Sequence, residues 1–499
     1  MNNNELCTDF RSFILSFVSR VKANPELRRK YFHGDVNAFT RTRLLPLEKL
    51  TLHMATRDSK DLSNCLIDDF GNGDKRPDKS AWVKALGKID ESYWKDLSDF
   101  LLDEITKTTE KKTFNGYEVY AIDSTTLALA SYDPKCFQEQ MVTHGQVSSY
   151  YALHINSAYD VCNDMFVGTV IQKGKELNEH EAAVTLTRKL ANGKKQIFLF
   201  DRGYPSYNLI AHLIENGQYF LIRSSNTNSL GGSLWEKYSN GKKEGSIHVT
   251  VTLTRLYKGT FNGKEGYENY IYAPQSMNFD FLPEKAPLKR GGKYKRGELD
   301  KVLKDCSYTL SFRIVRVKIG EEGSDNEYET LITNLSEEEF SDDDCKELYF
   351  WRWSEETGFR ELKHHEHLLY IHAKRTDFVI AEVHTAIMLH NITAAASLRA
   401  VEIGEERKKR EEERLGELNL DEDAYNKRRR RLRLLPDGDY ALNHSKAAGA
   451  IRCFLRNKDE TLKDLLKELV RNPVAIESGR SFERKLRPKG FIGFTYRAA

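Results

Sequence analysis

Four residues that suit phosphate chemistry recur at a regular spacing in the last third of the chain. They stand in the order Tyr349, Arg352, Glu356 and Lys363, a Y-x2-R-x3-E-x6-K pattern. An α-helix turns about 100° per residue, so on one helix these side chains would fall within an arc of roughly 60°. A carboxylate, two cations and a phenol on one face suit a metal ion and the phosphates of a nucleic acid.

Two aspartates upstream follow segments that have the pattern of strands. Asp123 ends the alternating run 117–122, and Asp201 ends the apolar run 197–200. An acidic residue cannot stay in a core unpaired, so we expect both at strand ends, where an open α/β sheet places its sites. With Glu356, these aspartates could hold two divalent cations through oxygen ligands.

The chain resembles a DDE transposase of the insertion-sequence-four family. Three matches carry the resemblance, which covers about residues 110–395: Ala-Ile-Asp-Ser-Thr at 121–125, Asp-Arg-Gly-Tyr at 201–204, and the four-residue signature above. In that family the acidic triad lies on a ribonuclease H-like fold. The resemblance therefore implies Asp123, Asp201 and Glu356 as catalytic metal ligands.

The implied reaction is two-metal phosphoryl transfer on double-stranded DNA, with Mg²⁺ as the metal and Mn²⁺ as its substitute. The enzyme would bind the terminal inverted repeats of its element, cleave the ends and join them to target DNA. It would act as a homodimer on the DNA ends, in the cytoplasm of a prokaryote. Tyr349, Arg352 and Lys363 would grip phosphates; the alternative is a surface ladder of ion pairs with Glu355 and Glu356.

Two other functions remain open on the same fold. One is a domesticated nuclease that hydrolyses DNA without joining it. The other is a DNA-binding protein that has lost the reaction, although the intact triad of acidic residues disfavours it.

The composition fits this interpretation without proving it. The chain is 39% hydrophobic and 30% charged, with a net charge of +3, and we find no run of the ~18 apolar residues that a membrane span needs. The start lacks the layout of a secretory signal. The seven cysteines include no C-x2-C pair, which predicts a reduced protein without a zinc site or a disulfide framework. We expect no membrane and no small-molecule substrate.

Residues 1–105 are predicted to form a helical DNA-binding domain. Phe10, Phe13, Ile14 and Phe17 recur at helical spacing. A basic stretch that includes Arg28, Arg29 and Lys30 follows, with aromatic residues between its cations, and such a mixture suits phosphate contacts. The alternative is a solvated face of a helical domain.

The catalytic core is predicted to span residues 106–225 and 341–395. The pattern gives three strands, a helix, a strand, a helix and a strand, the order of a ribonuclease H-like core: 117–123, 150–158, 164–172, 178–190, 197–200, 206–215 and 219–223. Residues 226–340 are predicted to be a β-rich insertion. Its basic loop, which includes Lys293, is a candidate DNA contact.

The signature helix is expected to begin near Ser341, with Asp344 completing a capping box. A long helix is expected over 377–414, and residues 396–499 form a helical C-terminal region. The basic block 427–433 is either a solvated linker or a contact with DNA or a partner chain.

Three histidines, His364, His365 and His367, follow the signature. Adjacent helical side chains point about 100° apart, and no cysteine or further histidine lies nearby in the sequence. We therefore expect these histidines to extend the DNA-facing end of the helix rather than to bind a metal.

Overall fold

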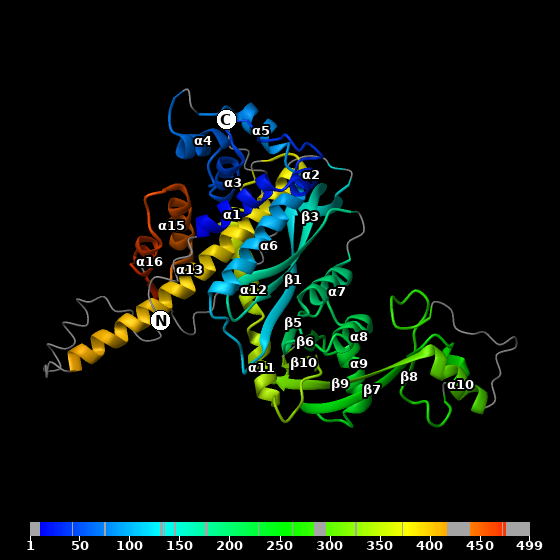
Figure 1. Ribbon diagram of the computed structural model, residues 1–499. Helices are drawn as coiled ribbons and strands as arrows, with labels where there is room; N and C mark the ends of the chain where they lie inside the picture. The colour runs from blue at the N-terminus through cyan, green and yellow to red at the C-terminus, as the bar shows by residue number, and fades with distance from the viewer. Residues whose placement is uncertain are drawn as a thin grey trace.

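The computed structural model describes residues 10–471 and 473–475, with two long gaps at 284–295 and 417–439. Further short gaps fall at 42, 74–75, 130–132, 134, 144–145, 175–177, 228, 262, 325–326 and 372. The protein is a mixed α/β structure in which a twisted sheet lies beside a bundle of helices (Figure 1). Lys293 and the basic block 427–433 lie outside the described residues.

Among the described residues, one ten-stranded sheet forms the centre of the fold, in the order β2-β3-β1-β5-β6-β10-β9-β7-β8 with β4 paired to β3. The strands of the predicted core are β1 (Glu118–Ala128), β3 (Gln146–Asp160), β4 (Met165–Gln172), β5 (Gln196–Phe200) and β6 (Tyr219–Ser224). β1, β5 and β6 run parallel, whereas β3 is antiparallel to both β1 and β4. This order and these directions are consistent with a ribonuclease H-like core.

One strand beside the predicted core strands was not predicted from the sequence. β2 (Phe137–Thr143) pairs with the first half of β3, whose second half pairs with β1. The first half of β3 is thereby extended beyond the residues 150–158 that the pattern gave.

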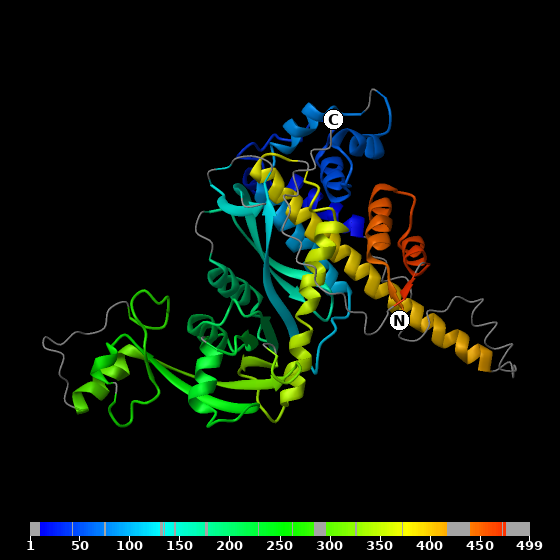
Figure 2. The ribbon, with the colours of Figure 1, turned by 180° about the vertical axis from the view of Figure 1, so that it is seen from behind.

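Helices cover both faces of the sheet (Figures 1 and 2). One face packs against α7 (Glu179–Leu190), α8 (Tyr207–Glu215) and α9 (Leu230–Tyr238). The other face packs against α11 (Asp342–Phe350), α12 (Trp353–His364) and part of α13 (Thr376–Gly416). The predicted starts of α7 and α11 are confirmed, because the Asn178 side chain accepts from the Glu181 N–H and Ser341 forms a capping box with Asp344.

The predicted insertion, residues 226–340, continues the central sheet instead of forming a separate one. Its strands are β7 (Gly245–Thr254), β8 (Tyr270–Tyr272), β9 (Ser307–Lys318) and β10 (Tyr328–Thr333). β10 is antiparallel to β6, so the register runs unbroken from the core into the insertion. β7, β8 and β9 extend away from the core toward α10 (Arg296–Cys306), and a short 3₁₀ turn, η1 (Lys258–Thr260), follows β7 (Figure 1).

The two ends of the described chain share one hydrophobic core around α13. Six helices precede the sheet: α1 (Phe10–Ala23), α2 (Pro25–Tyr31), α3 (Leu47–Ala55), α4 (Leu62–Phe70), α5 (Lys79–Leu86) and α6 (Glu91–Thr108). The last described elements are β11 (Tyr440–Leu442), α15 (His444–Arg456), α16 (Leu462–Val470) and β12 (Pro473–Ala475). Both groups bury side chains in the same cluster as α13, and Arg11 donates to the Leu455 and Asn457 carbonyls at 2.6 and 2.9 Å.

α13 is the one described helix long and apolar enough to cross a membrane by length and composition. The apolar window of its residues 376–403 is entirely buried by the rest of the protein. Its hydrophobicity is therefore that of a central core helix, which contacts the sheet on one side and the N-terminal helices on the other.

The basic residues of α2 differ from one another in their surroundings. Arg28, predicted to contact DNA, is buried, and its guanidinium donates to the carbonyls of Val36 and Ala38 at 2.6 and 2.5 Å. It stabilises the loop after α2, because these carbonyls have no helix or strand to satisfy them. By contrast Arg29 is exposed, and Lys30 is exposed and pairs with Asp96 at 2.5 Å.

Substituting the two neighbouring arginines of α2 should have very different effects on stability. Arg28→Ala leaves buried carbonyls without donors and should lower the free energy of unfolding by about 2–4 kcal/mol. Arg29→Ala, the matched control, should change it by less than ~0.5 kcal/mol. Thermal and denaturant unfolding of the two full-length variants measure the difference. Equal stability of the two variants would contradict this role for Arg28.

Candidate active site

Asp123 and Asp201 occupy equivalent places on two neighbouring parallel strands. The pairing of β1 with β5 ends at Ile122 and Phe200, and each aspartate is the next residue. Contrary to expectation, Asp123 does not end its strand: β1 continues to Ala128 because β3 still pairs with it there.

The strand pattern also sets the face on which both aspartates lie. Residues alternate between the two faces, so Asp123 follows Val119 and Ala121 onto one face, and Asp201 follows Ile197 and Leu199. These four apolar residues belong to the cluster covered by α11. Both carboxylates therefore lie on the side of the sheet on which α11 and α12 pack.

The signature does not lie on one continuous helix, as the spacing predicted. Tyr349 is on α11, Arg352 lies at the junction, and Glu356 and Lys363 are on α12. Across the junction the backbone stays helical in its dihedral angles but bonds to the third residue back, as in Arg352 N–H to Tyr349 O at 3.1 Å. Such a 3₁₀ turn rotates the second helix relative to the first.

Burial at the junction gives the physical reason for the break. Arg352 and Glu355 are 2% and 0% exposed, while Phe350 and Trp353 are 70% and 44% exposed. A continuous α-helix would satisfy the backbone hydrogen bonds equally well, so backbone bonding does not explain the break. The tight turn instead lets two charged side chains face the sheet beside Asp123.

Arg352 links two residues of the predicted triad. Its Nη2 donates to Glu356 Oε1 at 3.0 Å, and its Nη1 lies 3.6 Å from Asp123 Oδ2. Sequence reasoning expected this cation on an exposed face, gripping phosphate or pairing at the surface. In the structure the arginine is buried and pairs with two half-buried carboxylates, whose negative charge it compensates.

Tyr349 and Lys363 approach the two strands that carry the aspartates. The buried Tyr349 hydroxyl donates to Asp201 Oδ1 at 3.4 Å. Lys363 Nζ donates to Thr125 Oγ1, two residues beyond Asp123 on β1. All four signature residues are therefore near β1 or β5, although they reach these strands from different elements.

Glu355 is a site residue that sequence reasoning missed as a functional group. It is fully buried, and its Oε1 accepts from the Asp123 backbone N–H at 3.2 Å and from the Ser157 hydroxyl at 3.1 Å. Burial, followed by the charge of Asp123, raises its pKa well above the ordinary value. Its hydrogen bond fixes the backbone of Asp123. Glu355 and Glu356 are adjacent in the sequence, and nothing in the sequence indicates which of the two is buried.

The carboxyl group of Asp123 is raised in pKa to about 6. Burial is the largest cause, and the negative charges of Asp201 and Glu356 act in the same direction. The Ser124 N–H bond and the Arg352 charge oppose the shift without cancelling it. The three carboxylates are thus close enough to repel one another, which favours binding of a cation.

A glycine sets the distance between α12 and the sheet. A Cβ atom on Gly358 would lie 2.6 Å from Cε2 of Tyr159, a fully packed side chain of β3. Only glycine permits this approach, because any larger side chain would collide with the ring. The placement of Glu356, two residues earlier, depends on it.

The sequence pattern of the transposase DDE domain matches residues 114–392, more than half of the chain. The chain belongs to the transposase DDE domain family. The matched segment runs from the start of β1 to the middle of α13 and contains every signature residue, together with both aspartates. The DDE domain therefore includes the strands of the predicted insertion.

No curated protein matches the chain. Among solved structures it is similar to the piggyBac transposase synaptic complex with hairpin DNA, with a TM-score of 0.41 and 11% identity over 96% of this chain and 86% of that one.

Members of the DDE family use divalent metal ions, and the acidic residues of this domain fit them. Asp123, Asp201 and Glu356 offer the oxygen ligands that Mg²⁺ and Mn²⁺ prefer. The Arg352 guanidinium already lies between two of them, so the site attracts positive charge. Glu355 Oε2 is a buried carboxyl oxygen without a hydrogen-bond partner in the described chain, and the raised pKa of this group favours its neutral form while no cation is bound.

The histidines after the signature face other parts of the protein, not an open DNA-facing end as predicted. His367 Nε2 lies 3.2 Å from Asp58 Oδ1, and the His365 ring stacks on that of His444 with centroids 5.5 Å apart. Only His364 is exposed. Tyr204, after Asp201, is also buried and belongs to a structural turn.

The raised pKa of Asp123 predicts how stability depends on pH in metal-free protein. Because its folded pKa, about 6, exceeds the ordinary 3.8, its contribution to stability is fully present below about pH 3.8 and is lost as pH rises through about 6. Asp123→Asn cannot ionise, so with chelator at pH 8 it should exceed the wild type in stability by roughly 1–3 kcal/mol.

The difference between Asp123→Asn and the wild type should disappear near pH 4. Denaturant unfolding at several pH values measures it, with Glu236→Gln, an exposed carboxylate on α9, as the control. Parallel pH profiles for the wild type and Asp123→Asn would show that Asp123 titrates normally.

Proposed function

We propose that this protein is a transposase of the insertion-sequence-four type. It binds the terminal inverted repeats of its element as a homodimer, cleaves the DNA ends and joins them to target DNA by two-metal phosphoryl transfer, in the cytoplasm of a prokaryote. The observation that carries the proposal is the position of Asp123 and Asp201 on adjacent parallel strands, with Arg352 joining Asp123 to Glu356. Membership in the DDE family supports the same reaction.

Asp123, Asp201 and Glu356 are the proposed metal ligands. A bound pair of Mg²⁺ ions would supply an activated water or 3′-hydroxyl and would stabilise the leaving oxygen. Tyr349 orients the Asp201 carboxylate through its hydroxyl, and Glu355 fixes the Asp123 backbone. Both arrangements exist before DNA binds, so the ligands need little reorganisation.

Arg352 has two proposed roles that follow one another. In the metal-free protein it neutralises Asp123 and Glu356. When metal ions compensate these carboxylates, the guanidinium becomes available to a phosphate of the element end. Lys363 donates to Thr125 on β1, two residues beyond Asp123, and its proposed role is also to contact a phosphate.

DNA binding outside the catalytic site is proposed for three basic segments. The first is the helical region 1–105, in which Arg29 and Lys30 are exposed whereas Arg28 is not. The others are the loop around Lys293 and the block 427–433, both argued from sequence alone. The first region shares its core with α13, α15 and α16, so its binding has to be tested in the full chain.

The acidic triad should be required for cleavage and not for binding. Asp123→Ala, Asp201→Ala and Glu356→Ala should each lower cleavage of element ends below ~0.1% of wild type, because metal binding is lost. End binding in a gel shift should remain, since carboxylates do not attract phosphate. Glu347→Ala, an exposed acidic residue on α11, is the matched control.

Cleavage should also stop in chelator and return with Mg²⁺ or Mn²⁺. Joining of the cut ends to target DNA, measured in the same reaction, separates a transposase from a nuclease that only hydrolyses. A triad variant that cuts at the wild-type rate would remove its residue from the active site, and cleavage in chelator would end the two-metal proposal.

Lys363 should affect the reaction rate more than stability. Lys363→Ala should slow single-turnover cleavage roughly a hundredfold, corresponding to a loss of about 2.7 kcal/mol of charge stabilisation in the transition state. Arg360→Ala removes an exposed cation from the same helix and should leave the rate unchanged. A lower melting temperature of Lys363→Ala with an unchanged cleavage rate would assign Lys363 a structural role only.

A further inference from the structure

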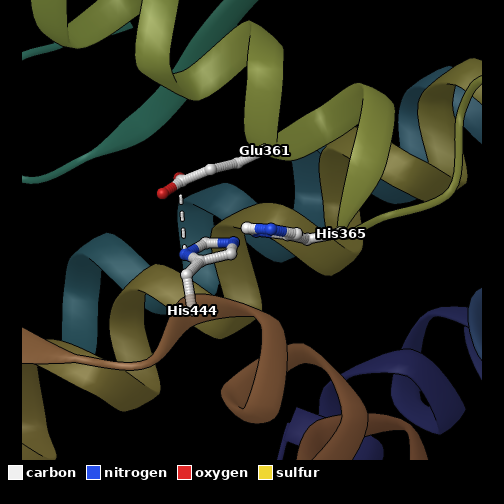
Figure 3. Close-up of side chains that lie close together, drawn as sticks. All are labelled: Glu361, His365 and His444. Carbon is white, nitrogen blue, oxygen red and sulfur yellow. Dashed lines mark ion pairs between the residues drawn. The ribbon is translucent and has the colours of Figure 1, made fainter. Parts of the chain in front are cut away.

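A second group of potential metal ligands lies where the C-terminal end of α12 meets the start of α15. Glu361 and His365 are four residues apart, so they project from the same face of the helix end. His444, the first residue of α15, lies opposite them, and Figure 3 shows the three side chains facing one another. Their ligand atoms all lie within 4.8 Å of one another.

His444 is held in a way that suits a metal ligand. Its Nε2 lies 3.3 Å from Glu366 Oε1, and its Nδ1 lies 3.4 Å from Glu361 Oε2. Metal-binding histidines commonly donate their second ring N–H to a carboxylate, which fixes the tautomer. Glu366 would provide that bond, leaving the Nδ1 lone pair directed toward Glu361.

Glu366 is itself fixed. Its side chain is fully buried, and its Oε2 accepts from Arg452 Nη2 at 3.1 Å. The same Arg452 nitrogen donates to the carbonyl of His365 at 2.8 Å. The helix α15 therefore holds both the orienting carboxylate and the backbone of one candidate ligand in place.

His365 supplies an independent observation. Its Nδ1 is buried and has no hydrogen-bond partner in the described part of the chain. Burial, followed by the charge of His444, lowers the pKa of His365, so its ring is neutral and carries a free lone pair. A buried imidazole nitrogen without a partner is costly unless something binds it.

The charge balance of the cluster favours a cation. Burial raises the pKa of Glu361, and the nearby carboxylates of Asp164 and Glu366 raise it further. Burial lowers the pKa of His444, but the Glu366 hydrogen bond and the surrounding carboxylates outweigh it and raise this pKa. The two ring nitrogens of His444 face the Glu361 and Glu366 carboxylates at 3.4 and 3.3 Å, so a cation at Nδ1 would lie beside the Glu361 carboxylate.

We propose that Glu361, His365 and His444 form a zinc site that is separate from the acidic triad. Two imidazoles and one carboxylate are a ligand set that Zn²⁺ accepts, with one position left for water. Mg²⁺ prefers oxygen ligands, so it would not compete effectively here. An overlapping group of Glu366, His390 and His444 is less suitable, because Arg452 already neutralises Glu366.

The site would join two segments that are distant in sequence. His365 belongs to the end of the helix that carries Glu356, and His444 begins the C-terminal helices. A metal bridge between them closes a long loop and stabilises the docked position of α15. Zinc would therefore act on the structure of the protein rather than in strand cleavage.

The test is zinc binding by the full chain, stripped of metal and held in excess Mg²⁺ to occupy the acidic triad. Titration calorimetry should find one Zn²⁺ per chain, and Co²⁺ should give the visible absorption of a low-coordinate site. His365→Ala and Glu361→Gln should each weaken zinc binding at least ~100-fold. His364→Ala, the exposed neighbour on the same helix, should bind like the wild type.

Melting temperatures provide a second readout, which does not depend on DNA cleavage. Zinc should raise the melting temperature of the wild type and of His364→Ala, and should not raise that of His365→Ala or Glu361→Gln. Glu361→Gln keeps the shape of the side chain. If His365→Ala does not fold, Glu361→Gln still tests whether this cluster binds zinc. Zinc binding equal to wild type in both ligand variants, or no zinc binding by the wild type in excess Mg²⁺, would overturn the proposal.

Discussion

Repulsion among carboxylates at the point where the pairing of β1 with β5 ends is the constraint on which the rest of the site depends. Asp123 and Asp201 lie side by side because β1 and β5 are parallel and in register. Burial and the neighbouring charges raise the pKa of Asp123, and Arg352 compensates only part of that cost. To bring Arg352 inward, the chain breaks a helix between α11 and α12, at the expense of exposing Phe350 and Trp353. The conformation of the helical junction is thus linked to the electrostatic cost of bringing the carboxylates together.

Local patterns in the sequence predicted where helices and strands begin. The helix break at Arg352 and the partners of Arg28 depend on contacts that local patterns do not contain. The alternation of residues 117–122, the Asn178 cap and the Ser341 capping box each depend on a few neighbouring residues, and the structure contains all three. The break at Arg352 was missed because it depends on bonds from Glu355 to Asp123 and Ser157, about two hundred positions away. Arg28 was predicted to contact DNA because a basic stretch has the same sequence whether its arginines bind phosphates or loop carbonyls. In the structure Arg28 binds loop carbonyls.

The helical ends show the same limit on a larger scale. Amphipathic spacing predicted the helices but could not indicate that α1, α6, α15 and α16 pack around one helix, α13. The predicted boundaries at residues 105 and 396 lie where the sequence pattern changes. The hydrophobic core crosses both boundaries, because helices from both ends of the described chain pack together. The predicted N-terminal region is consequently joined to the C-terminal helices by Arg11 and by Arg456, whose Nη2 donates to the Thr56 carbonyl at 2.6 Å.

This shared core has a consequence for how the protein is made. Ile14 and Ile451 belong to the same hydrophobic cluster, yet they leave the ribosome far apart in time. At ordinary rates of translation that interval is roughly 20–90 s, during which the apolar faces of the first helices lack their final partners. All three predicted acidic ligands are synthesised before α15 begins at His444. A nascent chain therefore carries its catalytic residues before it can complete the core that supports them, and chaperones are expected to attend it until translation reaches the last helices.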